Sequence, residues 1–331
     1  MVYGIGNPLI DILIQVSEED ISALGLSKGT MHLVDSSERS RILTHCAGLP
    51  VEYRCGGSCP NTIIALASLG IDAVLGGKVG PDKEGDEYIR QLASFSSAST
   101  LARGQEATGS SIILITPDTE RTMNTFLGAN REFSLDDLDL DLVRNADYFY
   151  FTGYMWDTDA QKAAILAALG ACRNAGTKIV FDAADPFAVN RNRLEFLQLL
   201  DSHVDILFAN REEAGILFGS DSMEGCLAAL KKRCDTGVIK NGRHGSVVYS
   251  NGAEYSIPIF PATALDSTGA GDMYAAGFLY GLIQGLGPRE AGLCASWLAG
   301  KIVQIKGAQF SPREFEAVRQ GLEAGEWKVS G

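Results

Sequence analysis

The stretch ALDSTGAGDMYAAGFLYG, residues 264–281, places three small residues and a single carboxylate at the start of an apolar helical pattern. Gly269, Ala270 and Gly271 allow a ligand to approach the backbone closely, and the first N–H groups of the helix have no partner inside it. A helix start of this kind attracts negative charge, so it could hold a phosphoryl group during its transfer. Asp272 would then accept a proton from a substrate hydroxyl. The alternative is a tight turn followed by an ordinary acidic first-turn residue.

On both sides of this helix start, the chain alternates short apolar runs with helical segments. The predicted strands are 2–7, 73–80, 148–153, 178–185, 204–210 and 236–242. The predicted helices are 60–69, 83–95, 159–175, 191–201, 211–218, 223–233, 272–285, 288–305 and 312–324. This alternation predicts an α/β fold with βαβ units and a mostly parallel sheet. Ligands bind beyond the carboxyl ends of the strands in such sheets, which is where the motifs of this chain fall.

Two further β-like segments interrupt this alternation. They are GTMHLVD (29–35) and SSIILITPDTERTMNTFLG (110–128), and the second predicts a hairpin that turns at Pro117-Asp118-Thr119-Glu120. Together they indicate a small additional sheet, either a flap over the active site or an ordinary sheet edge.

The composition is that of a globular protein with a substantial core. Of the 331 residues, 46% are hydrophobic, which suits one large α/β domain or two ordinary ones. The net charge of −13 argues against a nucleic-acid partner or an anionic membrane surface, but not against a small anionic ligand. No run approaches the roughly 18 apolar residues of a membrane span, and the N-terminus lacks a basic flank and a cleavage site. We therefore expect a soluble, cytoplasmic protein.

Several common site motifs are missing. The seven cysteines include no CxxC pair, and the four histidines do not group with them, so we expect neither a zinc cage nor a disulfide framework. The P-loop G-x-x-x-x-G-K-[ST] and the dinucleotide motif G-x-G-x-x-G are also absent. A kinase with this sequence would need another phosphate cradle.

A second glycine-led helix start lies in GGSCPNTIIALASLG, residues 56–70. Gly56 and Gly57 allow close backbone approach, and Asn61 could hold a polyol hydroxyl; Pro60 also fits an ordinary helix start. In GNPLID (6–11), Asp11 lies in an apolar run and needs a partner. That partner would be a pair of sugar hydroxyls or nearby backbone groups.

Four other segments allow a functional and a structural interpretation. Asn210 and Glu213 have the spacing of a capping box but could also organise water and Mg²⁺ near phosphates. Gly242 and Gly245 could bracket a nucleotide or form a generic turn. Arg121 could move to lie over bound phosphates, or its side chain could simply be exposed to solvent.

Tyr154 and Trp156 could stack on a planar ring of a ligand or pack in the core.

The order of these motifs resembles the ribokinase-like (PfkB) family of carbohydrate and nucleoside kinases. The matching patterns are G-x-G-N-x-x-x-D near the start, G-G-x-x-x-N near 60, N-x-x-E near 210 and D-x-T-G-A-G-D near 270. The resemblance covers essentially the whole chain. It implies a doubly wound α/β core with helices on both faces, formed by 1–12, 36–100 and 131–331, and a small β lid formed by 13–35 and 101–130.

The resemblance also implies a role for each matching residue. Asp272 would be the catalytic base, and the backbone of Gly269, Ala270 and Gly271 the anion hole. The substrate-binding residues would be Asn7, Asp11, Gly56, Gly57, Asn61 and Arg121. The nucleotide-binding residues would be Asn210, Glu213, Lys240, Gly242, Gly245 and Thr268.

The implied cofactors are ATP and Mg²⁺, with Glu213 reaching the metal through water. Asp266 and Thr268 match positions that bind potassium in some relatives. The partner would be a small-molecule sugar or nucleoside, and the protein would be a monomer or a homodimer.

The substrate that the resemblance favours is a nucleoside. GNPLID, ERTMNTFLGAN, FTGYMWDT and FANREEA are most similar to bacterial adenosine kinase-like chains. The aromatic residue that would stack on the base cannot be chosen among Tyr154, Met155 and Trp156. Phosphorylation of a free sugar, as by ribokinase or fructokinase, is the alternative. A non-catalytic nucleoside sensor is disfavoured because binding alone needs no base at position 272.

Overall fold

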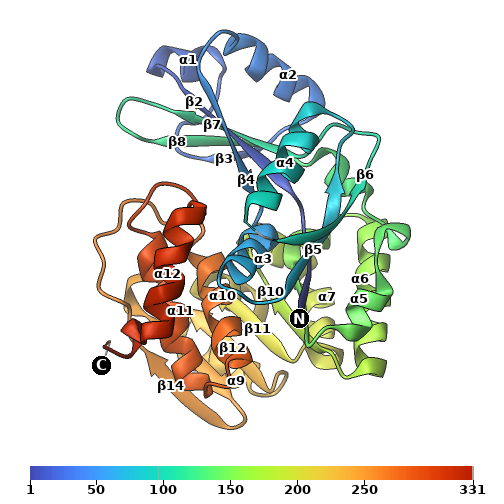
Figure 1. Ribbon diagram of the computed structural model, residues 1–331, viewed down its shortest axis with the longest axis vertical. Coiled ribbons are helices and arrows are strands. Elements are labelled where there is room, and N and C mark those ends of the chain that lie inside the picture. Colours follow the sequence, from blue (N-terminus) through green and yellow to red (C-terminus); the bar gives the residue numbers. More distant parts are fainter. Residues whose placement is uncertain (96, 330–331) are drawn as a thin grey trace.

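The computed structural model describes residues 1–95 and 97–329, which form two β-sheets covered by helices (Figure 1). The larger sheet has nine strands in the order β14-β13-β12-β11-β10-β9-β1-β5-β6. Their bounds are β1 Val2–Ile5, β5 Ala73–Val79, β6 Ala98–Arg103, β9 Tyr148–Thr152, β10 Lys178–Asp182, β11 Ile206–Asn210, β12 Thr236–Lys240, β13 Ser246–Ser250 and β14 Ala253–Ile257. All neighbours pair in parallel except β12 with β13 and β13 with β14, which are antiparallel. The predicted mostly parallel α/β sheet is confirmed.

Helices cover both faces of the larger sheet, as expected for a doubly wound fold, while the first two helices of the chain lie beside the smaller sheet (Figure 1). The helices are α1 Glu18–Ala23, α2 Ser36–His45, α3 Ser58–Ser68, α4 Lys83–Ser94, α5 Leu140–Asn145, α6 Asp159–Ala175, α7 Pro186–Ser202, α8 Arg211–Phe218, α9 Met223–Leu230, α10 Ala270–Ile283, α11 Pro288–Ile302 and α12 Pro312–Ala324. Alternate residues of one strand enter different cores: Tyr150 packs with α3 and α10, whereas Phe149 and Phe151 pack with α6 and α7. This division explains why the central strands read as continuous apolar runs rather than alternating ones.

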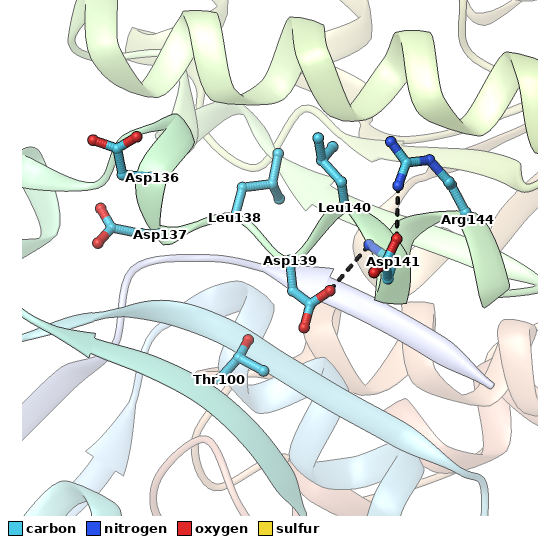
Figure 2. Close-up of a pocket in the computed structure, with 8 residues that line it drawn as sticks. All are labelled: Thr100, Asp136, Asp137, Leu138, Asp139, Leu140, Asp141 and Arg144. Atoms are coloured by element: carbon cyan, nitrogen blue, oxygen red, sulfur yellow. Dashed lines mark hydrogen bonds and ion pairs between the residues drawn. The ribbon is translucent and has the colours of Figure 1, made fainter.

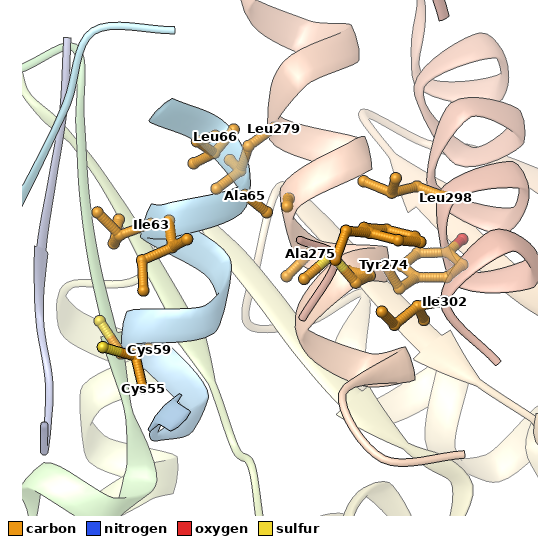
Figure 3. Close-up of a cluster of buried hydrophobic side chains, with 14 of the residues drawn as sticks. Cys55, Cys59, Ile63, Ala65, Leu66, Tyr274, Ala275, Leu279, Leu298 and Ile302 are labelled. Atoms are coloured by element: carbon orange, nitrogen blue, oxygen red, sulfur yellow. The ribbon is translucent and has the colours of Figure 1, made fainter. Parts of the chain in front are cut away.

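The position of α10 is fixed by close packing against α11. A Cβ atom on Gly277 would lie 2.8 Å from the Cα of Ala295, and one on Gly281 would lie 2.7 Å from the Cα of Ala291. Figure 3 shows the apolar side chains of α3, α10 and α11 that fill the space around this contact. Because the two backbones touch, α10 has little freedom to move, and its N-terminus is held in one place.

The smaller sheet has five strands in the order β3-β8-β7-β2-β4 and lies above the larger one in Figure 1. Its strands are β2 Leu9–Gln15, β3 Met31–Leu33, β4 Val51–Gly56, β7 Ser110–Ile115 and β8 Arg121–Phe126. β7 and β8 form the predicted hairpin, with Thr119 in the left-handed region at φ 69°. The predicted small additional sheet is therefore present.

The sequence interpretation missed several elements. They are the strands Leu9–Gln15, Val51–Gly56, Ala98–Arg103, Ser246–Ser250 and Ala253–Ile257 and the helices Glu18–Ala23, Ser36–His45 and Leu140–Asn145. The missed strands mostly lie at or near sheet edges, where exposed positions dilute the apolar pattern; the pattern of β4 is exposed over its first half. The helix predicted for 191–201 begins five residues earlier, at Pro186, and is kinked at Asn192.

The two sheets do not follow the expected division of the chain. β2 joins the smaller sheet from Leu9 onward, and β4 belongs to it although 36–100 was assigned to the core. β6 ends at Arg103 inside the larger sheet, although the lid was expected to begin at 101. No helix in residues 1–95 and 97–329 combines the length and the apolar character that crossing a membrane requires.

Candidate active site

A cavity of about 640 Å³ opens where β10, β11 and β12 end and α10 begins. Its polar lining comes from four elements that are far apart in the sequence, which is the usual place for a ligand in an open parallel sheet. The residues that carry its charges are Asp182, Glu213, Lys240, Arg243 and Asp272. We call it the large cavity.

The turn that leads into α10 has a backbone conformation that favours glycine. Gly269 has φ 75°, and a Cβ atom there would lie 2.6 Å from the carbonyl oxygen of Ala308. Within the part of the chain that the structure describes, the N–H groups of Gly271 and Asp272 have no backbone acceptor. Two donors and the positive end of the helix dipole therefore face the large cavity, as an anion site requires.

Asp272 is held by two side chains from the start of α3. The hydroxyl of Ser58 donates to Oδ1 at 2.6 Å, and Nδ2 of Asn61 donates to Oδ2 at 2.8 Å. Burial raises the pKa of Asp272, the two hydrogen bonds oppose that rise, and the result is a pKa of about 6. A carboxylate with this pKa is ionised at neutral pH and basic enough to take a proton.

Asn61 has a different contact from the one that its spacing predicted. It was expected to hold a substrate hydroxyl, but its Nδ2 faces Asp272 and its Oδ1 accepts a hydrogen bond from Nε2 of Gln309 at 2.7 Å. Asn61 is 4% exposed. In this arrangement it supports the carboxylate of Asp272.

Asp11 lies in a second cavity, of about 430 Å³, between the smaller sheet and the segment before α12. Burial raises its pKa to about 7, against the charges of Arg121 and Arg54, which lower it. A Cβ atom on Gly56 would lie 2.7 Å from Oδ1 of Asp11, so glycine at that position makes room for the carboxylate. We call this the acceptor cavity.

The remaining residues near Asp11 form the turn between β4 and α3 and the end of β1. Gly57 has φ 101°, and a Cβ atom there would lie 2.2 Å from the carbonyl oxygen of Asn7. Nδ2 of Asn7 donates to the carbonyl of Tyr154 at 3.4 Å, whereas its buried Oδ1 has no partner among the described residues. Asn7 thus offers one free acceptor.

Arg121 links the smaller sheet to the segment that leads into α10. From the start of β8 its Nη1 lies 2.5 Å from Oδ2 of Asp266 and 3.4 Å from the hydroxyl of Thr268. Asp266 also accepts hydrogen bonds from the N–H groups of Thr268 and Gly307, both at 2.9 Å. The two residues predicted to bind potassium are therefore already engaged with donors of the protein.

Of the two cations that line the large cavity, Lys240 is the one beside Asp182. Its Nζ lies 3.3 Å from Oδ2 of Asp182, and a Cβ atom on Gly271 would lie 3.3 Å from Nζ. Burial alone would lower its pKa, but the charges of Asp182, Glu213 and Asp272 raise it. A permanent positive charge is therefore held against the turn that begins α10.

Glu213 and Asn210 form the capping box that their spacing predicted. Asn210 Nδ2 and N donate to Glu213, at 2.5 and 2.8 Å, and Glu213 N donates to Asn210 Oδ1 at 2.9 Å. Burial raises the pKa of Glu213 to about 7, and the charge of Lys240 opposes the rise. Both residues also line the large cavity, so the cap does not exclude a role at a ligand.

Gly242 and Gly245 also line the large cavity, on the short 3₁₀ turn Gly242–His244 between β12 and β13. Gly245 has φ 81°, and a Cβ atom there would lie 2.2 Å from the carbonyl oxygen of Ile257. The predicted turn is present.

The aromatic pair after β9 divides between core and cavity. Trp156 is 4% exposed, donates its Nε1 to Glu195 and packs edge-on against Phe196, so the stacking role considered for it is wrong. Met155 is fully buried. Tyr154 lines the large cavity and is 36% exposed, and it alone of the three could meet a ligand there.

Figure 2 shows an acidic hollow lined by Thr100 of β6 and by residues of the segment 136–144. Asp137 pairs with Lys78 at 2.8 Å, Asp139 caps α5, and Asp141 pairs with Arg144 at 2.7 Å. Three of the four carboxylates of the hollow therefore already have partners, and the large cavity, which brings charges of both signs together, is the better candidate site.

Three residues of the site escaped the sequence interpretation. Ser58 directly follows Gly57, and Asp182 lies within the predicted strand 178–185, so both belong to segments that the sequence had already marked. Gln309 stands 248 residues from Asn61 and carries no motif that would have linked the two.

Comparisons with known proteins show the family and the fold of the chain. Residues 20–314 match the sequence model of the pfkB family of carbohydrate kinases. A 5-dehydro-2-deoxygluconokinase of Clostridium perfringens is 28% identical over 288 residues, covering 81% of this chain and 83% of the relative. A probable sugar kinase from Rhizobium etli CFN 42 superposes with a TM-score of 0.87 at 32% identity, covering 98% of both chains. An adenosine kinase from Sinorhizobium meliloti superposes with a TM-score of 0.86 at 32% identity, covering 97% of this chain and 98% of the other.

Proposed function

Because the chain belongs to the pfkB family of carbohydrate kinases, we propose that it transfers the γ-phosphate of ATP to the 5′-hydroxyl of a nucleoside such as adenosine. The observation that carries this proposal is the position of Asp272. It lines the large cavity beside an anion-binding turn, and Asn61 and Gln309 connect it to the acceptor cavity.

The large cavity fits the phosphates of ATP. The N–H groups of Gly271 and Asp272 and the ammonium of Lys240 converge there. They would hold the phosphoryl oxygens and offset charge that develops during transfer. Gly242 and Gly245 would face the rest of the nucleotide.

Mg²⁺ would be held in this cavity through its bound water molecules. Among residues 1–95 and 97–329, no three His, Cys, Asp or Glu side chains gather closely enough to hold a metal directly. Mg²⁺ keeps several of its waters in kinase sites, and Glu213 and Asp182 would accept hydrogen bonds from them. When bound, the ion would neutralise phosphate charge.

In the proposed reaction Asp272 accepts the proton of the acceptor hydroxyl as that oxygen attacks the γ-phosphate. The O–H bond of the acceptor breaks, an O–P bond forms, and ADP leaves. Ser58 and Asn61 keep the carboxylate oriented and ionised until the proton arrives. Asp11 and the free Oδ1 of Asn7 would accept hydrogen bonds from other hydroxyls of the sugar.

A nucleoside is favoured over a free sugar by the apolar part of the acceptor cavity. Leu13, Phe95, Ile305 and Phe310 line it beside Asp11, and a base would cover that surface. The similarity to the Sinorhizobium meliloti adenosine kinase extends over nearly the whole chain.

Phosphorylation of a free sugar is the second candidate. Arg54, Arg121 and Lys306 also line the acceptor cavity, and they would suit an acidic sugar such as the one named for the 5-dehydro-2-deoxygluconokinase relative.

A phosphorylation assay separates these candidates. Adenosine, inosine, guanosine, cytidine, ribose, fructose and 5-dehydro-2-deoxygluconate are offered with ATP and Mg²⁺, and products are identified by mass. We expect adenosine to be converted to its 5′-monophosphate fastest. Preference for a free sugar would replace the nucleoside proposal, and tight nucleoside binding without turnover would indicate a sensor.

We also propose that the smaller sheet serves as a lid, closed by the Arg121–Asp266 ion pair, and that Arg121 takes the place of a monovalent cation beside Asp266. Replacing potassium by tetramethylammonium should therefore change kcat within about twofold, since a charge-assisted Arg–carboxylate pair already satisfies Asp266. Steady-state rates at equal ionic strength test this. Strong stimulation of the wild type by potassium would contradict it and restore Asp266 and Thr268 as cation ligands.

A further inference from the structure

A chain of two hydrogen bonds ends on the base of the proposed reaction. Gln309 Nε2 donates to Asn61 Oδ1 at 2.7 Å, and Asn61 Nδ2 donates to Asp272 Oδ2 at 2.8 Å. The three residues come from the segment after α11, from α3 and from α10.

The orientation of the Asn61 amide decides whether it helps or opposes Asp272. With Nδ2 toward the carboxylate, Asn61 donates a hydrogen bond to a negative charge; with the amide rotated by half a turn, Oδ1 would face that charge instead. Asn61 has no side-chain hydrogen bonds among the described residues other than those to Asp272 and Gln309. Gln309 presents its Nε2 to Asn61 and is thus the one described partner besides Asp272 that reinforces the orientation in which Nδ2 faces the carboxylate.

The segment that carries Gln309 is anchored on both sides. The N–H of Gly307 donates to Asp266 at 2.9 Å, and Phe310 is buried against Phe315 with ring centroids 5.2 Å apart. The carbonyl of Ala308 packs against Gly269. The same segment therefore supports the anion-binding turn and presents Gln309 to Asn61.

We infer that Gln309 is a positioning residue for catalysis, because it fixes the amide of Asn61 so that Asn61 donates to Asp272. This inference rests on the proposed role of Asp272 as the base. Gln309 itself need not touch the reacting atoms.

Other charged and titratable groups face Asp272 and must be kept apart from this effect. Asp182 raises its pKa and Lys240 lowers it, while Ser58 donates the other hydrogen bond. Burial raises the pKa of Cys59 and of the phenols of Tyr150 and Tyr154, and the charge of Asp272 adds to that rise. Glu213 and Asp11 also titrate near neutrality, so a pH–rate profile alone does not identify Asp272.

The test compares Gln309→Met with Gln309→Glu. Met keeps much of the length of the side chain but cannot donate, and Glu offers an acceptor to Asn61 and favours its rotated amide. In Gln309→Met the Asn61 amide loses the hydrogen bond that holds it in place, so its own hydrogen bond to the charged Asp272 should weaken. The pKa of Asp272 should then rise by up to about one unit, a fraction of the loss expected when a hydrogen bond to a charged group is removed outright. In the pH profile of kcat/KM, the acid limb should shift to higher pH by the same amount as the pKa of Asp272. At high pH, kcat/KM should recover to the value of the wild type.

Two measurements report the shift. Carbon-13 NMR of carboxyl-labelled protein follows Asp272 directly, with its resonance assigned by its disappearance in Asp272→Asn. Gln320→Glu is the matched control for added charge, because Gln320 is exposed on α12; its profile should match that of the wild type.

The outcomes distinguish the inference from the function on which it rests. An unchanged Asp272 pKa in both folded variants overturns the role of Gln309. A raised KM for the acceptor without a shift of the acid limb would make Gln309 a substrate contact instead. If the wild type phosphorylates none of the acceptors, the proposed function fails, and the NMR titration still decides whether Gln309 controls Asp272.

Discussion

Replacing Asp272 with Asn is expected to lower kcat by roughly 10²–10⁴-fold, the usual contribution of a general base. Asn cannot take the proton of the acceptor hydroxyl, while the turn at Gly269 and Lys240 remain to hold the phosphates. We therefore expect KM for ATP to change far less than kcat. Steady-state kinetics with the preferred acceptor measure both constants, and near-normal turnover would rule out Asp272 as the base.

Stability separates this effect from a folding defect. The pKa of Asp272 is about 6 in the folded chain and lower in the unfolded one, since burial disfavours the charged form. Ionisation therefore costs stability as the pH rises from the unfolded pKa through 6. Asp272→Asn removes that cost, so its Tm at pH 7 should equal or exceed that of the wild type. Asp136→Asn, on the exposed acidic hollow, is the matched control and should leave both kcat and Tm unchanged.

Replacing Gly269 with Ala is expected to lower kcat/KM for ATP by about 10²–10³-fold, as the loss of an oxyanion-hole donor does elsewhere. The left-handed φ of 75° disfavours any residue with a Cβ atom, and that atom would meet the carbonyl oxygen of Ala308 at 2.6 Å. The turn must therefore shift, and the N–H groups of Gly271 and Asp272 move with it. Initial rates at varied ATP concentration test this.

Gly285→Ala provides the control for backbone strain. Gly285 ends α10 with φ 78°, and a Cβ atom there would meet nothing within 4 Å. Both variants bear the conformational cost of about 1–2 kcal/mol for a left-handed residue, but only Gly269→Ala displaces the anion-binding turn. Equal loss of activity in the two variants would show that strain alone is responsible. Thermal unfolding of the two variants measures the loss of stability that they share.

Much of the fold could be predicted from the sequence because its signals are local. The helices Asp159–Ala175, Arg211–Phe218 and Pro312–Ala324 begin and end where predicted, since their caps lie within a few residues of each terminus. The central strands were found because both of their faces are buried. The strand β2 pairs with β4 and β7, which are distant from it in the chain, and β4 is an edge strand with an exposed first half, so neither has a strong local signal.

The candidate site divides in the same way. The helix start at 269–272 and the capping box at Asn210 and Glu213 involve neighbours in sequence, so residue order alone indicates them. The sequence left open whether Tyr154 and Trp156 pack in the core or meet a ligand. Packing decides this: Trp156 is buried and hydrogen-bonded to Glu195, whereas Tyr154 faces the large cavity.

The alternation of strands and helices, the glycine turn and the carboxylate that follows it can all be recognised in the order of the residues. These features depend on backbone conformation and on interactions within about one helical turn. The partners of Asn61 and Asp266, in contrast, follow from the folded chain. Hydrogen bonds between Gln309 and Asn61, 248 residues apart, and between Arg121 and Asp266, 145 apart, exist because folding brings distant segments within 3 Å. No local pattern encodes a distance between segments that only the packed core brings together.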